Sequence, residues 1–173
     1  MVFSRAWTPP FDTMRRMACY AAIQEGATYL AYKGQKEKAE LEGDEVLQAI
    51  FSYVASDEAA HAGFYRKMVK IELGANREAT VSDFAHVLAN FKMPGDGLIP
   101  RYQERLRAGG GGITARSFME EVVLPTLRSL GITRAEIKSA RAFVRLADPG
   151  ARTIHFEDRD SSVANRRADR VAR

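Results

Sequence analysis

Two long stretches with helical periodicity dominate the sequence and constrain its fold most strongly. The first covers about residues 13–38 and the second about residues 44–73. In both, apolar residues recur every three or four positions, which places them on one face of a helix. Gly43 lies between the stretches and is typical of a helix end, whereas Asp44 begins the second stretch and is typical of a helix start. The sequence therefore predicts a pair of long antiparallel helices in an all-α fold.

Polar residues interrupt the apolar face of both stretches. Glu25 lies on the face of the first, whereas Glu58 and His61 lie together on the face of the second at i, i+3 spacing. Glu25 and Glu58 are each about 16 residues, or about 25 Å, from a turn at Gly43, so they reach the same height. Burying carboxylates without a cation is costly. We therefore predict a metal site formed by Glu25, Glu58 and His61.

Two other interpretations of these residues remain open. A lone Glu-x-x-His pattern occurs by chance in many helices and is usually exposed. A buried Glu25 can also be satisfied by Arg15, Arg66 or Lys67 instead of by a metal.

The rest of the chain also has helical character, and no stretch shows the alternation of a strand. "SDFAH" repeats the i, i+3 spacing with Asp83 and His86, but we interpret Asp83 as the N-cap of a helix over about 83–92. We expect one helical domain over residues 8–147. A charged tail, residues 148–173, mixes both signs with few apolar residues and is predicted to be partly disordered.

Composition narrows the class of protein. The chain has 173 residues, of which 46% are hydrophobic and 28% charged, as in an ordinary soluble domain. Its one cysteine, Cys19, excludes an internal disulfide and suits a reducing compartment. No signal-peptide core and no apolar run of about 20 residues is present. We therefore expect a cytoplasmic protein with no membrane span. Residues 148–173 contribute only +1 of the net charge of +4, and we expect no nucleic-acid partner.

The segments "IQEGATYLAYKG" and "ASDEAAHAGFYRKMVK" resemble the C-terminal half of the soluble acyl-carrier-protein desaturases. The likeness continues through "FAHVLANFKMPG" and "GITARSFMEEVVLP", and it covers about residues 10–135. Members of this family are ferritin-like di-iron oxidoreductases of fatty acid metabolism, which use O2 to introduce a double bond into an acyl chain. The resemblance implies iron as cofactor, acyl carrier protein with its acyl chain as substrate, and a ferredoxin-like electron donor. The basic chain suits an acidic carrier protein.

The resemblance also implies roles for individual residues. Glu25 matches a lone glutamate ligand, and Glu58 with His61 matches the second Glu-x-x-His pair of the family. Thr28 matches a threonine near the oxygen-binding side of the metal cluster, where its hydroxyl donates a hydrogen bond or relays a proton. An ordinary helix threonine is the alternative. Asp57 matches an acid that orients a ligand histidine from the other half of the bundle.

The sequence departs from the family pattern in one respect. The family site needs a first helix pair with another glutamate and another Glu-x-x-His, and Glu58–His61 is the only such motif here. We expect this chain alone to lack a complete site. Three hypotheses follow: part of a desaturase from a split or wrongly started gene, lacking its N-terminal half; a homodimer whose two copies supply the full ligand set of an iron-binding oxidase or storage-like protein; or a non-catalytic remnant.

Overall fold

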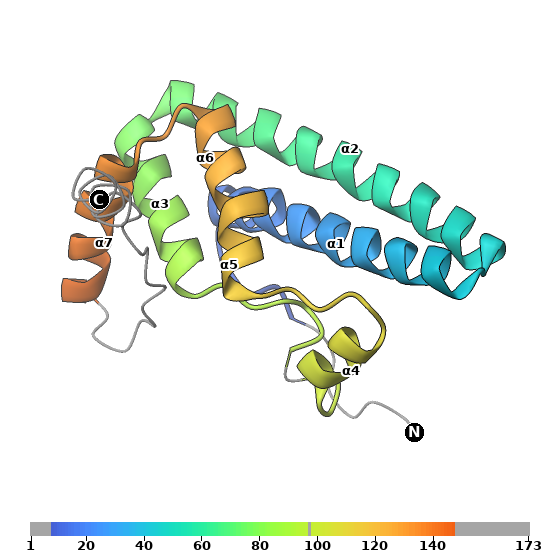
Figure 1. The fold of residues 1–173 in the computed structure, drawn as a ribbon. Helices are drawn as coiled ribbons and strands as arrows, with labels where there is room; N and C mark the ends of the chain where they lie inside the picture. Colours follow the sequence, from blue (N-terminus) through green and yellow to red (C-terminus); the bar gives the residue numbers. More distant parts are fainter. Residues whose placement is uncertain (1–7, 97, 148–173) are drawn as a thin grey trace, which may run out of the picture.

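The predicted helix pair forms the longest part of the fold. The computed structural model describes residues 8–96 and 98–147, and the predicted charged tail lies outside these residues. Helix α1, Met14–Glu42, and helix α2, Glu45–Ala75, pack along each other as an antiparallel hairpin (Figure 1). The described residues contain helices and no strand, which confirms the predicted all-α fold with its long antiparallel helix pair. Within them, no helix has the length and apolar character needed to cross a bilayer.

Local chemistry sets the ends of the hairpin. The Thr13 side chain accepts a hydrogen bond from the Arg16 amide at 3.2 Å and begins α1. Gly43 ends α1 with a φ of 72°, a left-handed conformation that glycine adopts without strain. Asp44 then begins α2, because its side chain accepts from the Leu47 amide at 2.9 Å. The turn predicted at Gly43 is confirmed.

Shorter helices cover one end of the hairpin. Helix α3 packs against α1, α2 and α7, while α6 contacts α2 and the preceding π-helical turn η1 contacts α1. In Figure 1 the part of the hairpin around its turn extends away from α3, α6 and α7. The bounds are Arg77–Ala89 for α3, Tyr102–Ala108 for α4, Ala115–Ser117 for α5, Phe118–Val123 for η1, Leu124–Leu130 for α6 and Arg134–Ala147 for α7.

The interpretation of Asp83 as a helix cap is wrong. Asn76 caps α3 by accepting from the Ala79 amide, so Asp83 lies in the middle of the helix, where it is buried. Its two carboxylate oxygens accept from Arg15 Nε at 2.6 Å and from Arg16 Nε at 2.8 Å. The carboxylate therefore links α3 to the start of α1 as a buried ion pair.

The hydrophobic core lies at the covered end of the hairpin. It combines the first half of α1 and the last third of α2 with α3, η1, α6 and α7. Two glycines of α1 allow other segments to approach closely. A Cβ on Gly26 would lie 2.9 Å from Val122 Cγ1, and one on Gly34 would collide with the carbonyl oxygen of Gly110. The glycine-rich segment 108–112 is therefore packed on α1. Fully buried side chains include Cys19, Ile23, Val69, Phe84, Val87, Leu88 and Val123.

Candidate metal centre

Three potential metal ligands meet inside the helix hairpin. Glu25 comes from α1, and Glu58 and His61 come from successive turns of α2. One ligand atom from each side chain lies within 4.8 Å of the other two. His61 Nδ1 is 3.8 Å from Glu25 Oε2 and 3.6 Å from Glu58 Oε2. The matched heights predicted from the turn at Gly43 are therefore confirmed, while the role of these residues as ligands stays a prediction.

The two carboxyl groups are unfavourable neighbours without a cation. Their side chains are only 16% and 18% exposed for Glu25 and Glu58. Burial, together with the hydrogen bond and the charge of Glu58, raises the pKa of Glu25 to about 8. Within the described part of the chain, no arginine or lysine pairs with Glu25, and Arg15 pairs with Asp83 instead. Two carboxylates facing each other in this way suit a bound cation.

The three side chains offer ligand atoms that suit a transition metal, and the group they form is exposed to solvent on one side. Two carboxylates and an imidazole nitrogen are ligands that iron accepts readily. The side chain of His61 is 60% exposed, so the group faces outward at the histidine. Three ligands from one side leave positions that other groups must fill. The residues therefore fit one half of a carboxylate-bridged metal site.

The structure does not bring the other two predicted site residues into this group. Thr28 lies one helical turn after Glu25, and its hydroxyl donates to the Gln24 carbonyl at 3.0 Å and accepts from Gln24 Nε2 at 2.9 Å. Asp57 precedes Glu58 on α2 and is exposed. Their roles at the centre stay predictions.

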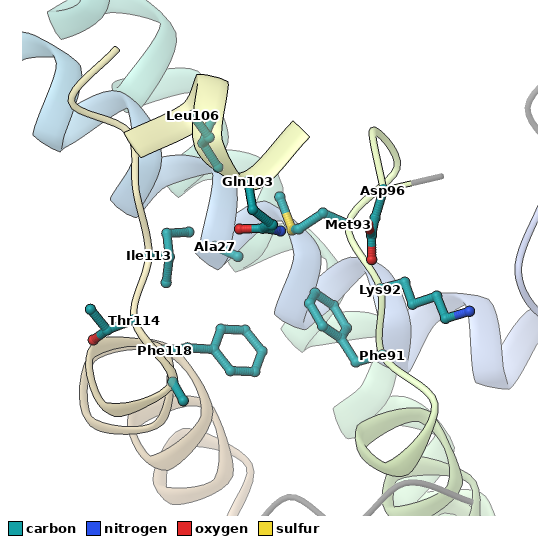
Figure 2. Close-up of a pocket in the computed structure, with 11 residues that line it drawn as sticks. Ala27, Phe91, Lys92, Met93, Asp96, Gln103, Leu106, Ile113, Thr114 and Phe118 are labelled. Atoms are coloured by element: carbon teal, nitrogen blue, oxygen red, sulfur yellow. The ribbon is translucent and has the colours of Figure 1, made fainter. Parts of the chain in front are cut away.

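A cavity that the sequence did not predict lies on another side of α1. It has a volume of about 210 Å³, and Ala27 contributes to its wall. Because Ala27 follows Glu25 by two residues, the two point to nearly opposite sides of the helix. Figure 2 shows Phe91, Met93 and Phe118 around this cavity. These residues come from distant segments, which explains why periodicity gave no signal for the cavity.

Comparison with known proteins assigns a family to the segment that carries the candidate ligands. A family model described as fatty acid desaturase matches residues 9–107, which is more than half of the chain. The match includes α1, α2 and α3 and therefore Glu25, Glu58 and His61. A comparison with curated proteins gave no match, and neither did one with solved structures.

Proposed function

The chain belongs to the fatty acid desaturase family of soluble acyl-carrier-protein desaturases, and from this membership we propose that it supplies half of a di-iron desaturase site. The observation that carries the proposal is the meeting of Glu25, Glu58 and His61 within 4.8 Å, inside the segment that matches the family. The remaining ligands come from a facing helix pair. The assembled enzyme acts on an acyl chain attached to acyl carrier protein.

The overall reaction defines what the site must provide. A –CH2–CH2– unit, O2, two electrons and two protons become –CH=CH– and two molecules of water. Bound iron supplies the oxygen activation, and we propose a ferredoxin-like protein as the source of the electrons. The chain itself supplies two carboxylates and one imidazole, held in place by the packing of α1 on α2.

Two further residues assist in this proposal. The Thr28 hydroxyl donates a hydrogen bond or relays a proton once it leaves the Gln24 carbonyl. Its position one turn from Glu25, on the same helix face, supports this role. Asp57 is exposed beside Glu58, and we propose that it accepts a hydrogen bond from a ligand histidine on the facing helix pair.

The experiment combines the full chain with a polypeptide that carries the first helix pair of a desaturase of this family. Fe2+ binding is measured anaerobically by calorimetry, and unsaturated product is measured by mass spectrometry after acyl-carrier-protein substrate, ferredoxin, reductant and O2 are added. We expect iron binding and product from the pair of polypeptides. Glu58→Gln should remove both, whereas Glu40→Gln, at an exposed glutamate on α1, should change neither. Equal iron binding by wild type and Glu58→Gln would overturn the proposal.

A further inference from the structure

Helix α2 carries a row of apolar side chains that the described fold leaves uncovered. The residues recur every three or four positions, so they share one face of the helix. Asp57 and His61 lie within this row, which follows the outer side of the metal centre. We call it the α2 stripe, and it consists of Val46, Ile50, Tyr53, Phe64 and Ile71, which are exposed, and Met68, which is half-buried and packs in part against the core.

The α2 stripe is symmetric about its own middle. The pairs 50 and 68 and 57 and 61 are centred on residue 59, and the pairs 46 and 71 and 53 and 64 are centred midway between residues 58 and 59. If two α2 helices pair antiparallel about this point, aliphatic residues face aliphatic ones and Tyr53 faces Phe64 of the second copy. Asp57 faces His61 of the second copy, so a carboxylate meets an imidazole. The stripe is therefore complementary to itself, as a two-fold interface requires.

We propose that a second copy of this chain packs antiparallel on the α2 stripe and completes the metal centre. Glu58 and His61 lie within about three residues of the two-fold axis, which is about 5 Å along each helix. The dimer then contains two lone glutamates and two Glu-x-x-His pairs, the ligand set of a four-helix di-metal carboxylate site. Asp57 of each copy orients the ligand His61 of the other. The metal part of this inference rests on the proposed function.

Sedimentation of the metal-free chain tests the interface. We expect a dimer at micromolar concentration, because exposed apolar residues gathered on one helix face mark an interaction surface. Phe64→Lys should weaken self-association by at least about 100-fold, since two apolar contacts are lost at once. Leu41→Lys is the control, because Leu41 is 89% exposed and lies at the end of α1, outside the α2 stripe. Phe64 is itself 58% exposed, so its substitution leaves the core intact, as circular dichroism can verify.

Cross-linking tests the antiparallel orientation. Tyr53→Cys and Phe64→Cys are prepared as separate variants and treated with a short bismaleimide, alone and mixed. The native Cys19 is fully buried and does not react. We expect a cross-linked dimer from the mixture and little from either variant alone, because residue 53 faces residue 64 only across the antiparallel interface. Efficient cross-linking of one variant with itself, or a monomeric wild type, would overturn the inference.

Iron stoichiometry separates this inference from the proposed function. The wild-type dimer should bind two irons and Phe64→Lys fewer, in line with its loss of dimer. A monomer that binds iron only with the first helix pair of a desaturase would refute the homodimer and leave the proposed function standing. A dimer sensitive to Phe64→Lys that binds as much iron after Glu58→Gln as before would retain the interface and refute the metal site.

Discussion

Replacing Glu25, a proposed metal ligand, with glutamine should stabilise the metal-free protein. Glutamine has the size of glutamate and carries no charge. In the folded chain, burial beside Glu58 raises the pKa of Glu25 from 4.5 to about 8. Near pH 7 the fold therefore disfavours the ionised carboxyl group, which the unfolded chain tolerates in water. The substitution removes this unfavourable charge from the folded state.

The sign and size follow from the pKa difference. A carboxyl group whose pKa is raised by folding leaves stability unaffected below 4.5, and it lowers stability progressively as pH rises from 4.5 to about 8. Each pH unit in that window corresponds to up to about 1.4 kcal/mol. Solvent on the exposed side of the site, at His61, screens the charge of Glu25. We therefore expect Glu25→Gln to raise the free energy of unfolding by about 1–2 kcal/mol at pH 7. For a chain of this size, that gain raises Tm by roughly 2–8 °C.

Urea unfolding followed by circular dichroism measures the effect, at pH 4, 5, 6, 7 and 8 in the presence of a chelator and at one protein concentration. The stability difference between Glu25→Gln and wild type should be near zero at pH 4 and grow up to pH 8. Glu40→Gln, at an exposed position of α1, should show no such growth. The reasoning is refuted if Glu25→Gln gains no stability between pH 5 and 8, or if its advantage shrinks as pH rises.

Three further predictions concern other parts of the fold. Gly34→Ala should lower the free energy of unfolding by about 1–3 kcal/mol, because the added Cβ would collide with the Gly110 carbonyl. Gly63→Ala, at a helical glycine with open space beside it, should raise the free energy of unfolding by about 0.5–1 kcal/mol, and urea unfolding measures both changes. Asp83→Ala should destabilise by about 2–4 kcal/mol by leaving two arginines of α1 without their carboxylate, and a calorimetric Tm unchanged within error would contradict this. Hydrogen bonds from Arg77 of α3 and from Thr133, just before α7, lower the pKa of Glu136 to about 2. The contribution of Glu136 to stability is therefore complete above pH 4.5 and disappears toward pH 2. The gap between wild type and Glu136→Gln in acid unfolding curves should close over that range.

The hairpin and the meeting of Glu25, Glu58 and His61 could be predicted from the sequence because their signals are local. Gly43 and Asp44 are residue types typical of a helix end and a helix start, so they predict the turn. The positions of Glu25 and Glu58 along the hairpin then follow from the constant rise per residue of a helix. The i, i+3 spacing of Glu58 and His61 requires no knowledge of the rest of the fold.

Other features depend on contacts between distant segments, and they could not be predicted. Asp83 has the spacing of a cap, but its partners Arg15 and Arg16 lie nearly seventy residues away in the sequence. The close packing of Gly34 on Gly110 likewise involves a loop whose path composition does not specify. A glycine-rich stretch in a sequence usually indicates a flexible loop, whereas here the glycines allow two backbone segments to pack closely.

The core at one end of the hairpin has a consequence for hydrogen exchange. Amides near the turn at Gly43 lie in the part of the hairpin that α3, α6 and α7 leave uncovered, so they should open by local unfolding at lower free energy than amides around Phe84. Glu25 and Glu58 lie between these two regions. A ligand that joins α1 to α2 at this point stabilises the closed hairpin by mass action. Slower exchange should therefore spread from the core toward the turn as Fe2+ is added, which makes the exchange rates of these amides a residue-by-residue record of site occupancy.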